Sequence, residues 1–291
     1  MALTSVQSFY SPEDNKTVIE LLDKHEDSAL IVAGGTFLHG LVSRGLLSGI
    51  EALISIQKLG LNKIDVGKGA ISIGATTLLG QLKGCPQVQQ ESWLGAIKDA
   101  MEYPPVQIMN SGTIGGSISS SCPFFDFPVS LLALDGSVQA EGGSGSRDIP
   151  LQEFFAGLFE NSLASDEFVT GVSIPVPSKS STSAFIKMET NANDLAILNV
   201  GVRLTMGDAG ICDEARVFVG GGVGESPVRS PSAEAALTGG AVDNDAIDLA
   251  GQAVLADVDP LSDHRASADY RKAMSGVLLK RALKSAMQRL S

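Results

Sequence analysis

Two glycine-rich turns, each placed where an apolar run ends, are the residues of this chain best suited to chemistry. The first is Gly34-Gly35 after the run at 29–32, and the second lies within the segment 110–117. Glycine lets the backbone turn sharply and approach a ligand without an intervening Cβ, and such turns can point N–H groups at an anion. Two such turns that converge on one ligand suit the pyrophosphate of a dinucleotide.

Neither turn is decisive alone, because a strand-to-helix Gly-Gly turn also occurs in α/β proteins for packing, although such turns are frequent anion sites. The second turn is followed by small polar residues, namely Ser117, Ser119, Ser120 and Ser121. Side chains of this kind pack poorly in a core, so we expect them to line a polar ligand. The alternative is a mobile surface loop.

Two further glycine runs have different contexts. The run at 142–146 lies between two predicted strands and is expected to form a hairpin loop. The run at 220–224 lacks both the Walker lysine and the GxGxxG spacing, so we predict a turn after a strand.

The histidines lack metal-ligand spacing and no GxSxG nucleophile signature occurs. We therefore predict neither a metal site nor a catalytic side chain, and any enzymatic chemistry would come from a cofactor.

Length, charge and cysteine content limit the domain number, the binding partners and the cellular compartment that we expect for this chain. A chain of 291 residues holds two modest domains or one large one. A net charge of -12 and a pI of about 4.7 argue against nucleic acid or an anionic membrane. The three cysteines are far apart, and no apolar run is long enough to span a bilayer. We expect a reduced, cytoplasmic protein with no membrane span.

The elements that must carry the first turn follow from hydrophobic periodicity. Residues 15–25 are expected to form a helix, and 30–32 and 52–56 to form strands. Thr36 can cap a helix directly after the turn. These elements predict a compact βαβ-like unit.

Later elements fall on both sides of an extended polar linker predicted at 175–183. Before it we predict strands at 70–75, 137–141, 147–151 and 167–174, and helices at 78–82, 92–101 and 127–134. After it we predict strands at 184–188, 196–206 and 214–219, and then helices at 232–237, 246–256 and 266–290. Strands followed by helices indicate an α+β domain.

Several segments, taken in order, resemble the FAD-binding (medium) subunit of the molybdenum hydroxylases, the family of carbon monoxide dehydrogenase and xanthine dehydrogenase. The segment 32–36 resembles the family's first FAD loop, and 107–116 (QIMNSGTIGG) resembles its QIRNxGTIGG segment. Five further motifs of the family have similar segments later in the chain. They are Cys122-Pro123 followed by Asp126, the segment 154–157, the pair Lys187 and Asp194, the segment 227–229 followed by Glu234, and the segment 266–271. The chain departs from the family pattern at Met109, Ser117 and Cys122.

The resemblance implies an α+β fold. Residues 1–176 would form an FAD-binding domain of the PCMH/vanillyl-alcohol-oxidase type, made of two α/β subdomains at about 1–57 and 58–176. Residues 184–291 would form a C-terminal α+β domain with an antiparallel sheet and helices.

The resemblance also implies the residues that bind FAD. The pyrophosphate would lie on N–H groups of 33–38 and 113–116, and Lys187 or Asp194 would tune the flavin. Valine in place of Gly35 or Gly115 is expected to remove FAD by a steric clash. The full set implied is Val32, Ala33, Gly34, Gly35, Thr36, Phe37, Leu38, Gly112, Thr113, Ile114, Gly115, Gly116, Ser119, Cys122, Asp126, Ile174, Lys187 and Asp194.

By the same resemblance, this chain is an electron-transfer subunit that does not touch the organic substrate. A large subunit with the molybdenum cofactor would oxidise the substrate, and a small subunit with two [2Fe–2S] clusters would pass electrons to FAD. The acceptor would be NAD, a quinone, a cytochrome or oxygen. The assembly implied is a dimer of heterotrimers.

Two other functions stay open at this point. A free-standing FAD-dependent dehydrogenase or oxidase would need its own acid or base, for which the sequence has no strong candidate. A non-catalytic nucleotide-binding or assembly protein would fit the departures at Met109, Ser117 and Cys122. Copurification with two other subunits separates the first alternative from the subunit hypothesis, and failure to bind flavin would favour the second.

Overall fold

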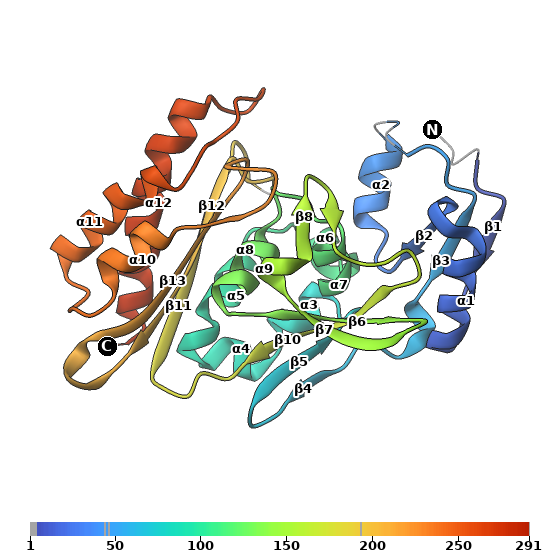
Figure 1. The fold of residues 1–291 in the computed structure, drawn as a ribbon, viewed down its shortest axis with the longest axis horizontal. Coiled ribbons are helices and arrows are strands. Elements are labelled where there is room, and N and C mark those ends of the chain that lie inside the picture. Colours follow the sequence, from blue (N-terminus) through green and yellow to red (C-terminus); the bar gives the residue numbers. More distant parts are fainter. Residues whose placement is uncertain (1–4, 44, 46, 193, 291) are drawn as a thin grey trace.

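A computed structural model describes residues 5–43, 45, 47–192 and 194–290 of the chain. Three sheets with their helices follow one another along the long axis of the molecule, from the N-terminal unit to the C-terminal one (Figure 1). None of the helices in these described ranges is long and apolar enough to cross a membrane.

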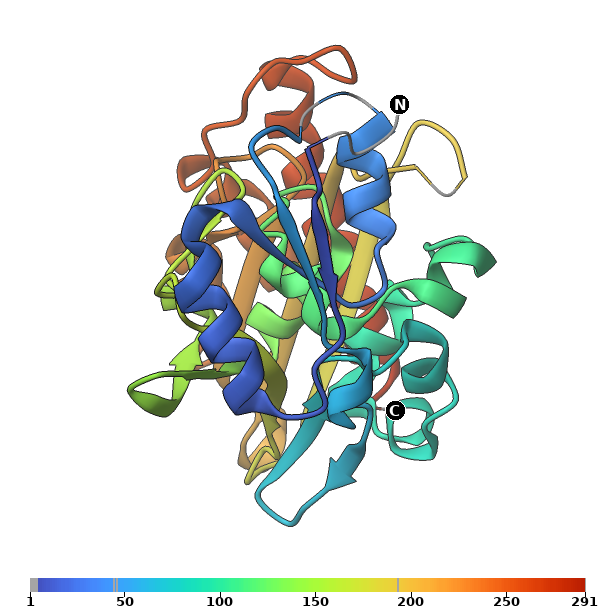
Figure 2. The same ribbon diagram turned by 90° about the vertical axis from the view of Figure 1, so that its right-hand side faces the viewer.

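The N-terminal unit is a three-stranded parallel sheet in the order β1–β3–β2. Its elements are β1 (Ser8–Tyr10), α1 (Asn15–His25), β2 (Ala29–Val32), α2 (Thr36–Ser43) and β3 (Ala52–Ser55). Val18 and Leu22, one turn apart on α1, are buried in a small core with Ile54 of β3. The predicted helices and strands of this unit are confirmed, and β1 is an additional strand (Figure 2).

The middle unit is built on a five-stranded antiparallel sheet in the order β4–β5–β10–β6–β7. Its strands are β4 (Ile64–Val66), β5 (Ala70–Gly74), β6 (Ser137–Gly142), β7 (Gly145–Pro150) and β10 (Phe168–Pro175). Its helices are α3 (Leu79–Lys83), α4 (Pro86–Gln90), α5 (Gly95–Ala100), α6 (Val106–Ser111), α7 (Ile114–Ser119), α8 (Asp126–Ala133) and α9 (Leu151–Phe154). A short hairpin, β8 (Phe155–Gly157) and β9 (Glu160–Asn161), follows α9. The hairpin predicted at 142–146 is the β6–β7 turn.

The C-terminal unit has strands first and helices afterwards, as predicted. Its antiparallel sheet is β11 (Ser181–Met188), β12 (Leu198–Met206), β13 (Cys212–Gly220) and β14 (Val228–Arg229). Its helices are α10 (Pro231–Leu237), α11 (Asn244–Ala253) and α12 (Ala268–Gln288). Short 3-10 turns occur in all three units, at Glu26–Ser28, Gln57–Leu59, Ser92–Leu94, Asp208–Gly210 and Val254–Ala256.

Helices cover the C-terminal sheet on both faces (Figure 1). Helices α10 and α12 pack on one face, where alternate residues such as Val200 and Val217 are buried among them. Helices α5 and α8 of the middle unit pack on the other face, and Phe185 and Phe218 of the C-terminal sheet belong to the middle unit's core. Because the two units share one hydrophobic core, the position of α8 depends on both.

The linker predicted at 175–183 is wrong in its last three residues. Ser181, Thr182 and Ser183 are buried residues of β11. Thr182 Oγ1 donates to the Ala286 carbonyl at 2.8 Å, and Ser183 Oγ donates to the Trp93 carbonyl at 2.7 Å. Hydroxyls whose hydrogen bonds are satisfied by backbone groups can be buried at little cost. The polar composition of these residues therefore hid the start of a strand that was predicted only at 184–188.

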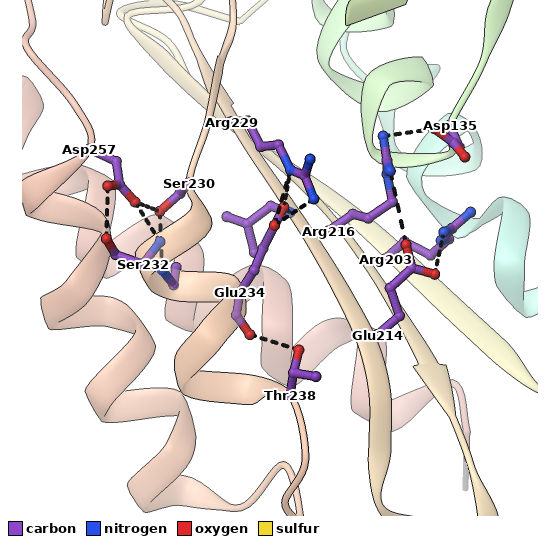
Figure 3. Close-up of polar contacts among 12 residues, drawn as sticks. Asp135, Arg203, Glu214, Arg216, Arg229, Ser230, Ser232, Glu234, Thr238 and Asp257 are labelled. Carbon is purple, nitrogen blue, oxygen red and sulfur yellow. Dashed lines mark hydrogen bonds and ion pairs between the residues drawn. The ribbon is translucent and has the colours of Figure 1, made fainter. Parts of the chain in front are cut away.

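The motif residues Arg229 and Glu234 hold the edge of the C-terminal sheet to α10 (Figure 3). The Glu234 carboxylate, 7% exposed, accepts from Arg229 Nε at 3.0 Å and Nη2 at 2.9 Å, and from the Val217 N–H at 3.0 Å. Ser230 caps α10 and also donates to Asp257 at 2.6 Å. These contacts give Arg229 and Glu234 a structural role, because they stabilise the packing of α10 against the sheet.

We expect Glu234→Gln to lower the free energy of unfolding by about 2 kcal/mol, because it weakens a buried, charge-assisted pair. Urea unfolding followed by circular dichroism measures the change. Asp248→Asn is the control, because Asp248 forms an ion pair with Lys280 in which its side chain is 59% exposed. Equal losses of stability in the two variants would contradict the structural role assigned to Glu234.

Candidate functional site

The two glycine-rich turns touch each other. Gly34 lies in the turn between β2 and α2, and a Cβ added there would overlap the carbonyl of Ser111 and lie 3.2 Å from the Gly112 Cα. Residues far apart in the sequence thus bring their backbones into direct contact, beside the starts of α2 and α7 (Figure 1). The structure therefore brings the two turns together, and their convergence on one ligand stays a prediction.

The first turn presents the open end of a helix. Gly35 has φ = 68°, a left-handed conformation that favours glycine. Helix α2 begins at Thr36 itself, and its first hydrogen bond runs from the His39 N–H to the Gly35 carbonyl at 2.9 Å. The N–H groups of Thr36–Leu38 therefore precede the hydrogen-bonded ladder. Such groups, at the positive end of the helix dipole, are suited to bind an anion.

The N–H groups of the second turn bind the protein itself. Ile114 donates to the Thr77 carbonyl at 3.1 Å, Gly115 to the Ala75 carbonyl at 3.0 Å, and Gly116 to Thr113 Oγ1 at 3.2 Å. The prediction that these N–H groups hold a pyrophosphate stays a prediction. In this structure the bonds of Ile114 and Gly115 fix the turn to the segment just after β5, and the bond of Gly116 caps α7.

The glycines of the turns also differ in why they are required. A Cβ on Gly115 would come within 2.6 Å of the Ala75 Cβ, so the close approach there is to the protein. A side chain on Gly35 would meet little but would strain the backbone, because of its positive φ. Valine at either position would therefore disturb the turn itself, and the clash with FAD expected from the sequence stays a prediction.

Two hydroxyl groups near the second turn are buried and have no hydrogen-bond partner among the residues that the structure describes. They are Thr77 Oγ1, on a residue that is 0% exposed, and Ser121 Oγ, on a residue that is 4% exposed. Thr77 accepts from Ile114 through its carbonyl, which places it against the turn. Buried polar groups are normally hydrogen-bonded, so these hydroxyls fit a polar ligand that supplies the missing partners.

A buried charged cluster lies where α8 begins. Lys187 Nζ, on a side chain 3% exposed, is 3.2 Å from Asp126 Oδ2 and 3.0 Å from Glu189 Oε2. Asn199 Nδ2 donates to Asp126 Oδ1 at 3.3 Å and to the Phe125 carbonyl at 3.2 Å. Burial raises the pKa of Asp126 to about 6, although Lys187 and Asn199 oppose this shift.

Comparison with known proteins identifies the family. Residues 4–177 match the family described as the FAD binding domain in molybdopterin dehydrogenase. Residues 183–286 match the CO dehydrogenase flavoprotein C-terminal domain. The chain belongs to this family of FAD-binding dehydrogenase subunits. It is an oxidoreductase subunit that binds FAD, and the resemblance inferred from its sequence is confirmed.

Relatives of this FAD subunit match along almost its whole length. It is 32% identical over 273 residues to the 6-hydroxypseudooxynicotine dehydrogenase complex subunit alpha of Paenarthrobacter nicotinovorans, covering 93% of this chain and 91% of that one. It is 29% identical over 283 residues to the carbon monoxide dehydrogenase medium chain of Afipia carboxidovorans, covering 97% and 96%. The solved structure of reconstituted CO dehydrogenase from Oligotropha carboxidovorans is similar, with a TM-score of 0.92 and 28% identity, covering 99% and 100%.

The structure of the FAD subunit places the sequence-predicted residues in three groups. The first group lies in the two turns or in the helices α2 and α7 that follow them: Val32, Ala33, Gly34, Gly35, Thr36, Phe37, Leu38, Gly112, Thr113, Ile114, Gly115, Gly116 and Ser119. The second is the pair Asp126 and Lys187, which the structure brings together. Cys122, 3% exposed, lies between these groups in the chain.

Two predicted residues are not brought to either group. Ile174 is 0% exposed and lies in the core of the middle sheet, opposite Ile71. Asp194 is partly buried, and its carboxylate accepts from the N–H of the next residue, Leu195, at 2.7 Å. Their assignment to FAD rests on the resemblance, and it stays a prediction.

Sequence reasoning missed two members of the charged cluster. Glu189 lies two residues after Lys187, a spacing that puts both on one face of an extended strand, so this signal was available. Asn199 pairs with Lys187 across β11 and β12. Register between strands is not visible in a single sequence, so no local signal pointed to Asn199.

We expect the stability of the FAD subunit to depend on the protonation of Asp126. Its folded pKa of about 6 lies above the ordinary value of 3.8, so the folded state keeps a proton that the unfolded state loses. The contribution to stability is therefore full below pH 4 and is lost as pH rises through about 6. Relative to Asp126→Asn, which cannot titrate, the wild type should lose about 3 kcal/mol over this window.

Urea unfolding of both proteins at intervals between pH 4 and pH 7 measures this difference. The other carboxylates titrate alike in the two proteins, so the variant is its own control for general acid effects. Parallel pH profiles for the two proteins would show that Asp126 does not keep a raised pKa in the folded chain.

Proposed function

We propose that this chain is the electron-transfer flavoprotein of a molybdenum-containing hydroxylase or dehydrogenase. It would take electrons from [2Fe–2S] clusters of a small partner subunit and deliver them to an external acceptor. A large subunit with the molybdenum cofactor would bind the organic substrate. The near-complete coverage of medium chains and FAD subunits by this chain supports a role as one subunit of such a complex.

The observation that carries the proposal is the contact of Gly34 with Ser111 and Gly112. It joins the two segments that resemble the family's FAD loops, and the N–H groups of Thr36–Leu38 precede the first hydrogen bond of α2 beside them. These N–H groups would hold the pyrophosphate, and the hydroxyls of Thr77 and Ser121 would supply further hydrogen bonds. FAD, when bound, supplies the chemistry of accepting and releasing electrons.

The chain itself binds and orients the cofactor in this proposal. Asp126 and Lys187 form a pair whose net charge depends on the Asp126 proton, so they can set the local potential near a bound flavin. The proposal also includes a cytoplasmic location for the protein and its assembly with the two partner subunits into a dimer of heterotrimers.

The test is the cofactor and subunit content of the purified protein. The chain is expressed alone and together with its neighbouring genes, and the absorption spectrum and the mass of the released cofactor are measured. One FAD per chain and two copurifying subunits are expected. A complex that contains no flavin would overturn the electron-transfer role, and an active, flavin-loaded chain without partners would favour a free-standing enzyme.

A further inference from the structure

Three phenylalanine rings from separate parts of the chain form a column beside the first turn. Phe37 is the second residue of α2, Phe125 precedes α8, and Phe159 lies at the tip of the β8–β9 hairpin. The Phe37 and Phe125 rings meet edge to face, with centroids 5.7 Å apart. The Phe37 and Phe159 rings are stacked at 6.1 Å with 29° between their planes. The column ends at Phe159, which is 48% exposed.

The end of this column is held in a strained conformation. Phe159 has φ = 61° and Ser121 has φ = 44°, a region that residues other than glycine rarely adopt. The Phe159 N–H donates to the Ser121 carbonyl at 3.3 Å, so the two strained residues are bonded to each other. Non-glycine residues held in this way cluster at ligand clamps, where the surrounding structure fixes a side chain for binding.

The hairpin is also fastened to the segment that follows the second turn. Asn161 Nδ2 donates to the Ser119 carbonyl at 3.1 Å, close in sequence to Ser121, whose buried hydroxyl has no partner. Phe159 is thus bonded through its backbone to Ser121, and its ring neighbour Phe37 contributes one of the N–H groups that precede the first hydrogen bond of α2. An aromatic face beside an anion-binding helix end suits a nucleotide, which has both a phosphate and a planar ring.

We propose that the exposed face of Phe159, supported by Phe37 and Phe125, stacks on a planar ring of the flavin dinucleotide. This inference rests on the proposed function and adds a ring-binding residue from a segment outside the two glycine-rich turns. The ring is the isoalloxazine or the adenine, which share the planar aromatic face that stacking requires. FMN, which lacks the adenine, distinguishes the two.

The experiment uses the protein with its copurifying subunits after flavin removal, titrated with FAD and with FMN while flavin fluorescence is followed. We expect Phe159→Ala to weaken FAD binding about tenfold, and Phe159→Tyr to bind as the wild type does. Leu158→Ala is the matched control, because Leu158 is a neighbour on the same hairpin and is 47% exposed. Weakened FAD binding with unchanged FMN binding assigns the adenine to Phe159, and equal weakening assigns the isoalloxazine.

Phe159→Leu is a second variant that keeps an apolar side chain against Phe37 without an aromatic face. Thermal unfolding shows that each variant is folded, so weaker binding in Phe159→Leu cannot be ascribed to loss of the hairpin. Unchanged FAD affinity in both Phe159→Ala and Phe159→Leu would overturn the inference, as would a loss of partner subunits with FAD affinity unaltered. Failure of the wild type to bind flavin would overturn the proposed function, and this inference with it.

Discussion

Gly34→Ala should purify with at least about tenfold less FAD than the wild type. The added Cβ has no space, because it would overlap the Ser111 carbonyl and lie 3.2 Å from the Gly112 Cα. Both obstacles are backbone atoms, which cannot move aside by rotating a side chain. The two turns must then separate, and the N–H groups of α2 lose their position relative to the second turn. A tenfold weaker dissociation constant corresponds to about 1.4 kcal/mol of binding free energy, and a tenfold loss of FAD from a filled site requires more than that.

The FAD-to-protein ratio, measured from the absorption spectrum, gives the result, and Gly40→Ala provides the matched control. Gly40 lies on the same helix, α2, with no atom within 4 Å of an added Cβ. Alanine there should keep full FAD and raise helix stability slightly, because glycine is the poorer helix former. Full FAD occupancy in Gly34→Ala would show that the contact between the turns does not shape the cofactor site.

Much of the fold could be predicted because its longer elements have a clear hydrophobic period. Helix α1 was predicted with its observed bounds, since Val18 and Leu22 repeat at helical spacing, and the structure adds that Asp14 caps it. Strands β12 and β13 were found from apolar runs that continue into a buried sheet. The order of strands and helices then gave the fold class of the C-terminal unit.

Short elements were the main failures. Helices α6 and α7 have six residues each and glycine or serine within them, so local propensity gave no helical signal. Strand β1 has three residues and is stabilised by pairing with β3. Whether such short elements form depends on tertiary contacts, and these contacts cannot be inferred from a single sequence.

For the site, too, some features could be predicted from the sequence and others could not. The position of the two turns was predictable, because glycine content marks a close approach of backbones. The partner of each N–H group was not, because the Ala75 and Thr77 carbonyls reach the second turn through the fold of β5. The family resemblance supplied Asp126 and Lys187, while Phe159 gave no signal, since a strained aromatic residue looks like any other in a sequence.

Lys187→Met should be among the most destabilising single substitutions in this chain, at about 3–5 kcal/mol near neutral pH. Lys187 is the cation between the carboxylates of Asp126 and Glu189, and its side chain is 3% exposed. Methionine has a similar shape but no charge, so the two carboxylates remain together with no counterion. Removal of one partner from a buried ion pair costs more than the pair contributes, because the remaining charge is left desolvated.

Three comparisons show whether this loss is electrostatic. The cost of Lys187→Met should shrink as pH falls toward about 6 and level off below it. Lys187 lowers the pKa of Asp126, so in the variant this pKa lies above the wild-type value of about 6 and Asp126 takes up its proton at higher pH. The double variant with Asp126→Asn should recover part of the loss at neutral pH, which a packing defect would not do. Lys83→Met, at an exposed ion pair with Glu102, should change stability far less. A loss that is equal at every pH and persists in the double variant would place the role of Lys187 in packing, and would remove the pair as a tuning element for the flavin.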